Sequence, residues 1–366
     1  MLFCKNLLFK SSLKVNHYIV TRFCLFILVD YQSLKKFDPD GMHKVYDRWP
    51  QICKESYQSN LDGVDFKNID HIVFAGMGGS GTIGDIFNSI LSKTQIHTTV
   101  VKGYRLPYTV DKNSLVVATS VSGNTSETLT ILDSAKNIGS KIIAFSSGGK
   151  MQEYCIKNKI EYRKIPEIHS PRASFTSFLY SILKVLDTIF PVTKAEIYDS
   201  ITQLESLSNQ ISSSNLNSSN PSLNLAEWIS EIPVIYYPWG LQAAAIRFKN
   251  SIQENTKSHA ITEDVIEACH NGIVSWEKPS NAKPILIEGK DDYFRTKERW
   301  SILKEYFETN NIPYREVHSV KGSILTKLIN LIYLLDYASI YRAIMLGVNP
   351  SPIKSIDFVK KHLREY

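Results

Sequence analysis

The chain has 366 residues, 43% apolar and 21% charged, a composition typical of a globular protein long enough for two domains. The formal net charge is +6, but Lys and Arg stand near Asp and Glu, as in residues 290–300, so no basic stripe indicates a nucleic-acid partner. The five cysteines are widely spaced and form no C-x-x-C pair, which argues against a zinc knuckle or a disulfide framework and favours a cytoplasmic protein.

The first thirty residues are predicted to be an extension of the globular chain. Residues 23–29 form a short apolar run, well below the ~20 residues that cross a bilayer, so no membrane partner is expected. Basic residues precede the run, as in a signal peptide, but no small-residue cleavage site follows and Asp30 ends it. We expect residues 1–30 to be disordered or to reflect a misassigned start, with the globular chain beginning at Tyr31.

Apolar strands and helical segments alternate from residue 71 onward. The predicted strands cover residues 71–76, 96–103, 114–120 and 141–147, and the predicted helices cover residues 82–93, 125–139 and 176–189. The strands contain little polar alternation. They therefore indicate a parallel sheet that is covered on both faces.

A polar stretch divides the chain. Residues 208–224 are rich in Ser and Asn, and are the predicted linker between a first domain at 31–207 and a second at 225–366. The second part repeats the alternation, with strands at 232–240, 283–289 and 314–320 and helices at 241–257, 291–311 and 323–347. The last helix is apolar enough to be the core of its lobe or a surface buried in a dimer. The predicted fold class is α/β, with two doubly wound lobes on central parallel sheets.

A glycine-rich loop follows the first strand. Gly76, Gly78 and Gly81 match G-x-G-x-x-G, a spacing that lets backbone approach an anion closely. A dinucleotide site also needs an acidic residue at the end of the second strand, where this chain has Lys102. The loop therefore argues against NAD, and no cofactor or metal is expected.

The third strand leads into a loop dense in hydroxyl groups at the start of a helix. Ser120, Ser122 and Thr125 offer O–H donors, and the helix amino terminus adds free N–H groups and partial positive charge. One Ser or Thr is enough for a helix cap, so this density favours a phosphate site over a cap alone.

Both loops, "GMGGSG" (76–81) and "SVSGNTSET" (120–128), resemble those of sugar isomerase (SIS) domains. "SPRASF", "RFKNSIQENTK", "HNGIVSWE" and "GVNPSP" follow in the same order and with matching spacing. From about Tyr31 to the carboxyl terminus, the chain is therefore similar to the bifunctional phosphoglucose/phosphomannose isomerase family. The resemblance implies two flavodoxin-like SIS lobes and a carboxyl-terminal helix that returns to the active site.

The resemblance also implies an activity: metal-independent isomerisation of glucose 6-phosphate, and of mannose 6-phosphate, to fructose 6-phosphate. A proton moves between C1 and C2 through a cis-enediol(ate), which needs a carboxylate base and a cation near the oxyanion. The family's base falls on Glu254, which by itself would pass for an ordinary helix-end carboxylate. Its enediolate-stabilising arginine falls on Arg172.

The remaining family roles fall on both halves of the chain. Ring opening is implied for His270 and for Lys360, with Lys361 as the rival in register. The sugar and its phosphate are implied to contact Gly79, Ser80, Ser120, Ser122 and Thr125. The family forms a homodimer in which the His of one subunit enters the other's active site.

Two departures from the family pattern bear on the dimer contact or the pocket rim. Gly272 stands where members commonly have an acidic residue, and the turn at Tyr236–Trp239 is bulkier than usual.

Two other functions remain open. A monofunctional phosphoglucose isomerase is one, because glucose and mannose phosphates differ only at C2. A non-catalytic SIS-type regulator that binds sugar phosphates is another, although residues 1–70 contain no convincing helix-turn-helix. Cys269 beside His270 also suggests a thiol nucleophile, but sequence neighbours seldom supply that geometry.

Overall fold

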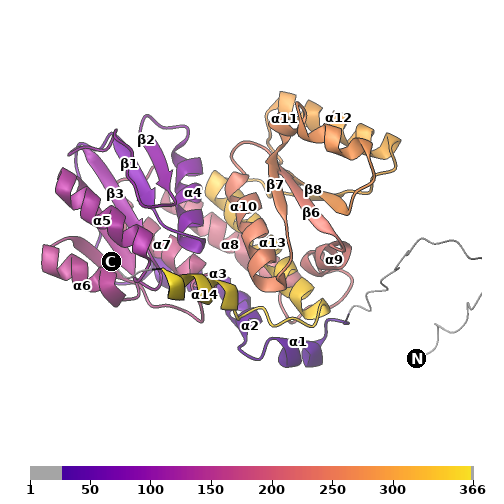
Figure 1. The fold of residues 1–366 in the computed structure, drawn as a ribbon, viewed down its shortest axis with the longest axis horizontal. Helices are drawn as coiled ribbons and strands as arrows, with labels where there is room; N and C mark the ends of the chain where they lie inside the picture. Colours follow the sequence, from indigo (N-terminus) through magenta and orange to yellow (C-terminus); the bar gives the residue numbers. More distant parts are fainter. Residues whose placement is uncertain (1–26, 364–366) are drawn as a thin grey trace, which may run out of the picture.

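The computed structural model describes residues 27–363 (Figure 1). Two lobes stand side by side, each with a parallel sheet, and helices α4, α8, α10 and α13 lie between the sheets. One hydrophobic core includes residues of both lobes, such as Phe87 and Phe248. The two predicted α/β lobes are therefore confirmed, and they share a core.

The first lobe contains a five-stranded parallel sheet in the order β2-β1-β3-β4-β5. Ile72 of β1 pairs with Thr98 of β2 and with Leu115 of β3. Strands β1 and β3 are buried along their whole length because helices cover both faces. The strands are β1 (His71–Ala75), β2 (His97–Val101), β3 (Ser114–Thr119), β4 (Lys141–Ser146) and β5 (Glu161–Lys164), and the helices are α1 (Tyr31–Phe37), α2 (Met42–Asp47), α3 (Trp49–Tyr57), α4 (Gly79–Leu91), α5 (Ser126–Ile138), α6 (Gly149–Asn158), α7 (Phe175–Val185) and α8 (Lys194–Ile211).

The second lobe contains a four-stranded parallel sheet in the order β7-β6-β8-β9. This order repeats β2-β1-β3-β4 of the first lobe, so each strand of the second lobe corresponds to one of these four, and β5 has no counterpart. The elements are α9 (Pro221–Trp228), β6 (Ile232–Tyr237), α10 (Gln242–Ser251), the π-helix η1 (Ile252–Thr256), β7 (Ile261–Asp264), α11 (Val265–Ala268), the 3₁₀ helix η2 (Gly272–Glu277), β8 (Ala282–Glu288), α12 (Phe294–Thr309), β9 (Arg315–His318), α13 (Ile324–Met345) and α14 (Lys354–His362).

Helix α13 lies at the centre of the molecule. It is long and apolar enough to cross a bilayer by length and composition alone. However, it is largely buried and packs against α8, α9 and α10. The sequence allowed this helix to be either the core of its lobe or a surface buried in a dimer, and in the structure it forms part of the core.

Both ends of the predicted first domain are more ordered than the sequence indicates. Val29 is buried, the Ile27 N–H donates to the Met345 carbonyl at 3.0 Å, and Asp30 caps α1, so packed structure begins before Tyr31. Residues 1–26 of the predicted extension lie outside the described residues. The stretch proposed as a linker, 208–224, includes the end of α8 and the start of α9, which Asn220 caps.

Candidate active site

The loops that were predicted to hold the substrate all follow carboxyl ends of strands in the first sheet. The glycine loop follows β1, the hydroxyl loop follows β3, and the segment with Arg172 comes after β5. Carboxyl ends of parallel strands meet at one edge of a sheet, which is where doubly wound folds bind ligands.

Two glycines of the glycine loop lie where the packing leaves no room for a side chain. A Cβ on Gly76 would lie 2.9 Å from Ser80, and one on Gly81 would lie 2.9 Å from the Gly76 carbonyl oxygen. Gly78 has φ 54°, a conformation that favours glycine. A Cβ on Gly79 would lie 3.3 Å from Nη1 of Arg247, so this glycine lets α4 approach the other lobe.

The hydroxyl loop leaves the start of α5 without a side-chain cap. Thr125 is the N-cap residue, but its hydroxyl lies 2.8 Å from the Ser120 hydroxyl and makes no capping hydrogen bond. The Ser120 hydroxyl also accepts from the Gly123 N–H at 3.1 Å, while Ser122 is partly exposed beside it. Free N–H groups at an uncapped helix start, next to several hydroxyls, suit a phosphate.

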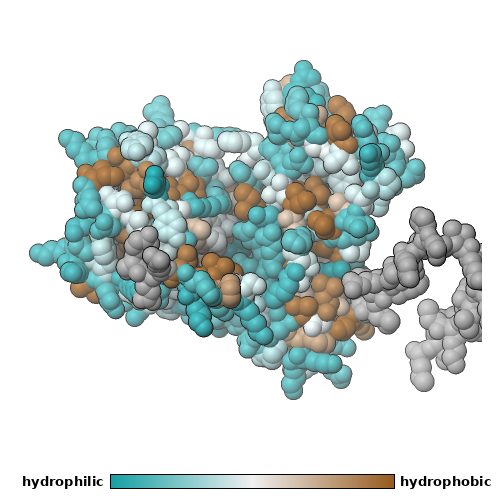
Figure 2. Space-filling view, in the orientation of Figure 1, coloured by the Kyte–Doolittle hydropathy of each residue, from teal (hydrophilic) through white to brown (hydrophobic). Residues whose placement is uncertain are grey.

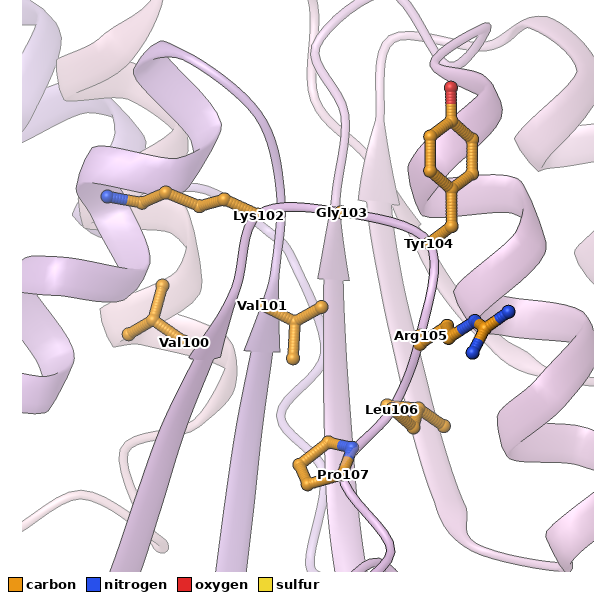
Figure 3. Close-up of a pocket in the computed structure, with 8 residues that line it drawn as sticks. All are labelled: Val100, Val101, Lys102, Gly103, Tyr104, Arg105, Leu106 and Pro107. Carbon is orange, nitrogen blue, oxygen red and sulfur yellow. The ribbon is translucent and has the colours of Figure 1, made fainter.

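The segment after β2 borders both loops. Residues 100–107 line an open hollow of about 600 Å³ (Figure 3). The Lys102 side chain extends toward α4, where its ammonium lies 2.6 Å from Asp85 and its stem lies beside Gly81. The Tyr104 hydroxyl lies 3.4 Å from that of Ser126 at the start of α5. A lysine paired with an aspartate thus occupies the position where a dinucleotide site needs a carboxylate for the ribose.

Glu254 and Arg172 form an ion pair between the two lobes. Nη1 of Arg172 lies 3.2 Å from Oε2 of Glu254, and its Nε donates to Oδ1 of Asn255 at 3.0 Å. Nη2 donates to the carbonyls of Pro350 at 2.6 Å and Ser351 at 3.0 Å. Four of the five N–H groups of a guanidinium are therefore used within the protein, which leaves one on Nη1 for a ligand. The Glu254 side chain remains 26% exposed.

A second, buried arginine supports this pair from behind. Nη2 of Arg247 donates to the Arg172 carbonyl at 2.8 Å and lies 2.7 Å from Oδ2 of Asp336. Burial opposes the charge of Arg247, but the negative charge of Asp336 outweighs it and raises the pKa of Arg247, so it stays a cation. Ser251 also donates to Asp336, at 2.6 Å. This network links α10, α13 and the Arg172 segment, and no role was predicted for Arg247 or Asp336.

The predicted site residues thus fall into two assembled groups and one that stands apart. In the first group, Gly79 lies next to Arg172, which contacts Glu254, and Ser80 is buried beside Gly79 in the first turn of α4. In the second group, Ser120 contacts Thr125. His270, Lys360 and its rival Lys361 are exposed. Within residues 27–363, no hydrogen bond or ion pair joins any of these three side chains to Glu254.

The departures from the family pattern have local explanations. A Cβ added to Gly272 would overlap the carboxylate of Glu263, so no larger residue fits there without movement. Tyr236 is buried and accepts a hydrogen bond from Nε1 of Trp276 at 2.8 Å. Trp239 is 76% exposed at the end of the turn. The bulky turn therefore fills the core of the second lobe on one side and presents an indole to the surface.

Cys269 is a poor candidate for a nucleophile. Burial is the main cause that raises the pKa of its thiol; the charge of Arg299 opposes this shift, and the carboxylates of Asp264 and Glu263 add to it. A thiol with a raised pKa holds little of the reactive thiolate at neutral pH.

One group of side chains in the described part of the chain has the spacing of metal ligands. Glu288, Glu316 and His318 place ligand atoms within 4.8 Å of one another. The Lys304 ammonium, however, lies 2.8 Å from Glu288 and 3.0 Å from Glu316. We therefore interpret the group as an ion-pair cluster of the second lobe.

Comparison with known proteins agrees with this architecture. The family model of the SIS domain matches residues 65–190, and that of the bacterial phospho-glucose isomerase C-terminal SIS domain matches residues 218–363. A solved structure of a hypothetical protein from Thermus thermophilus superposes with a TM-score of 0.69 at 13% identity, covering 90% of this chain and 91% of that one. At that identity the likeness concerns the fold.

Sequence relatives are more specific. The bifunctional phosphoglucose/phosphomannose isomerase of Caldicellulosiruptor bescii is 34% identical over 86% of this chain and 97% of the relative. The enzyme of the same name from Aquifex aeolicus is 32% identical over 81% of this chain and 91% of the relative. The chain therefore belongs to the bifunctional phosphoglucose/phosphomannose isomerase family.

Proposed function

We propose that this protein interconverts glucose 6-phosphate and mannose 6-phosphate with fructose 6-phosphate, and that it does so without a metal. The observation that carries the proposal is the pair of Glu254 and Arg172, a partly exposed carboxylate against a buried cation. This pair supplies a base and a positive charge, the two groups that an enediolate mechanism needs.

In the proposed reaction, the chemistry takes place at the lobe interface. Glu254 takes the proton from C2 of the aldose, the C–H electrons form the C1–C2 double bond, and the π electrons of the C1 carbonyl move onto O1, which gives the cis-enediol(ate). A proton passes from O2 to O1, the electrons of the C1–C2 double bond take the proton back from the carboxylic acid at C1, and the C2 carbonyl of the ketose forms. The remaining N–H of Arg172 stabilises the oxyanion, and Ser120, Ser122, Thr125 and the α5 amino terminus hold the phosphate.

The ring-opening groups motivate a second part of the proposal, a homodimer with shared active sites. His270 and Lys360 lie on the surface, and α14 has no buried residue. The exposed residues of α14 include apolar Ile356, Phe358 and Val359, and Figure 2 shows an apolar patch in this region. A second copy that covers α14 would bury this patch and bring its own His270 toward Glu254. The free thiols of Cys53, Cys155 and Cys269 fit a reducing compartment, so we place the dimer in the cytoplasm.

The alternatives are weaker on specific grounds. A regulator that only binds sugar phosphates has no use for a base held by an arginine. A monofunctional glucose isomerase differs only in how the site treats C2, so it is distinguished by assay.

The test is a coupled assay with glucose 6-phosphate and mannose 6-phosphate, run with and without a chelator. We expect turnover of both sugars, unchanged by the chelator. Turnover of glucose 6-phosphate alone would establish the monofunctional enzyme, binding without turnover would establish the regulator, and inhibition by the chelator would contradict metal independence.

Shared sites are tested by complementation. Glu254→Gln and His270→Ala proteins are each expected to be inactive, and mixing them under subunit exchange should restore part of the activity, because some hybrid sites contain both native residues. Mixtures that exchange subunits but stay inactive would contradict the shared site.

A further inference from the structure

Lys257 is the first residue after the π-helix that carries Glu254. It follows Glu254 by three positions and has φ 59°, a left-handed conformation that is uncommon for residues other than glycine. This backbone conformation ends η1 and turns the lysine side chain back over it. Its ammonium donates to the carbonyl of Glu254 itself at 2.5 Å.

The same ammonium reaches a distant part of the chain. Nζ of Lys257 donates to the Pro350 carbonyl at 3.1 Å, and that carbonyl also accepts from Nη2 of Arg172 at 2.6 Å. A carbonyl oxygen has two lone pairs, so these two cations use its full accepting capacity. Lys257 and Arg172 thus fasten the segment around Pro350 to the turn that holds Glu254.

The fastened segment connects α13 to α14. Helix α13 is fixed in the core, whereas α14 has no buried residue, and in Figure 1 it runs from the second lobe back beneath the first. The direction in which α14 leaves the core is therefore set chiefly by contacts of the connecting residues. Among these are the bonds at Pro350 and Ser351, and the bond of Asn349 to Asp40 at 3.2 Å.

We propose that Lys257 is a positioning residue for the isomerisation: it fastens the connection to α14 onto the Glu254 turn, and so fixes the base and the helix that carries Lys360 relative to each other. This inference rests on the proposed function, because it takes Glu254 as the base and Lys360 as a ring-opening group. It requires no contact between Lys257 and the substrate.

The electrostatic setting agrees with a fastening role. Burial and, after it, the charge of Arg172 together lower the pKa of Lys257 to about 8, while the charge of Glu254 opposes the shift. The protein therefore holds two cations at one carbonyl against their mutual repulsion. Hydrogen bonds from charged donors are stronger than neutral ones, which offsets part of this repulsion.

The decisive variant is Lys257→Met, which keeps the length of the side chain and removes the ammonium. Displacement of catalytic groups by about 1 Å can cost on the order of 100-fold in rate. We expect kcat to fall roughly tenfold or more, while KM for fructose 6-phosphate changes less than about twofold because the phosphate loop is untouched. Amide hydrogen exchange within residues 351–363 should become faster. Lys257→Arg, which retains a cationic donor, should recover most of the lost kcat.

Lys141 offers a matched control. Its ammonium also donates to two main-chain carbonyls, those of Asn68 at 3.4 Å and Lys112 at 3.0 Å, but it lies at the first residue of β4, the amino end of that strand. Lys141→Met should leave kcat and the exchange of residues 351–363 unchanged. If Lys257→Met matches this control in either measurement, Lys257 does not position the site.

The exchange measurement keeps this inference separate from the proposed function. If Glu254→Gln retained wild-type turnover, the base assignment would fail, and with it the catalytic role of Lys257. The fastening of residues 351–363 would still be judged by hydrogen exchange alone. If Glu254→Gln is inactive and Lys257→Met resembles the control, only the inference about Lys257 fails.

Discussion

The loop between β3 and α5 in the first lobe corresponds to the loop between β8 and α12 in the second, because the first four strands of the first sheet are in the same order as the four strands of the second. The first loop carries Ser120, Ser122 and Thr125 before an uncapped helix. The second carries two aspartates. Asp292 accepts from the Gly289 N–H at 2.9 Å and from Nε1 of Trp300 at 3.0 Å, and Asp291 pairs with Lys327 at 2.8 Å.

The difference shows how one architecture can serve two purposes. Carboxylates in the second loop already occupy nearby N–H groups and repel anions, whereas the first loop leaves its donors available. The second lobe contributes instead through the end of α10, where η1 places Glu254 against Arg172. The lobes are alike in fold; in the proposed mechanism the hydroxyl loop of the first lobe binds the phosphate, while Glu254 of the second lobe carries out the chemistry together with Arg172 of the first. Each prediction below tests this division.

The largest effect is expected at Glu254, the second lobe's contribution to chemistry. Glu254→Gln keeps the shape and the contact with Arg172 but removes the basicity. Loss of a general base typically costs ~10²–10⁴-fold in rate. The measurement is isomerisation together with exchange of the substrate C2 hydrogen into water. Glu227→Gln, an exposed glutamate on α9, is the control. Wild-type turnover and exchange in Glu254→Gln would defeat the mechanism.

The next effect concerns the first lobe's role in binding. Replacing Ser122 and Thr125 by Ala should raise KM for fructose 6-phosphate by about tenfold or more and lower kcat less than kcat/KM, because phosphate contacts serve ground and transition states alike. Ser134→Ala on the same helix, where the hydroxyl donates to the Thr130 carbonyl, is the control for fold and helix stability. An unchanged KM in the double variant would mean that this loop does not bind the phosphate of the substrate.

A smaller effect is expected from pH at the junction of the lobes. Burial and, after it, the charge of Arg172 together lower the pKa of Lys257 to about 8, with Glu254 opposing the shift. The ammonium therefore loses its proton as pH rises through about 8, and kcat should decline over that range. The free energy of unfolding should change in the opposite direction. The lysine of the unfolded chain keeps its proton up to its ordinary pKa of 10.5, whereas the folded one loses it at about 8, so the stability of the fold should rise with pH between these two values.

The pH profile is checked against Lys257→Met. The variant should lack the decline in kcat near pH 8, and its kcat should already be low at neutral pH. If the decline in kcat near pH 8 persists unchanged in Lys257→Met, the decline belongs to the titration of another group.

The smallest effect is expected in the second lobe's corresponding loop. Asp291→Asn should leave KM for fructose 6-phosphate within about twofold, because Asp291 is 54% exposed, so its pair with Lys327 contributes little, and no phosphate is expected there. Steady-state kinetics checks it. A large fall in KM would mean that the aspartate repels the substrate, and that the second loop borders the binding site after all.

The sequence by itself determined most of the architecture. Buried strands such as β1 and β3, and helices such as α5 with Gly139 as its left-handed C-cap, have strong local patterns of apolar residues and glycines. The edge strands β5 and β7 were not predicted because they are short and partly exposed, so they lack an apolar run. The spacing of motifs was also sufficient to indicate the family.

Only the tertiary structure decided how the site residues meet. Arg172 and Glu254 are separated by 82 positions in the chain, and Lys257 reaches a carbonyl 93 positions away. No local pattern encodes such contacts, because they depend on how α13 packs the two lobes together. The use of four Arg172 N–H groups within the protein, and the exposure of His270 and Lys360, likewise follow from packing in three dimensions.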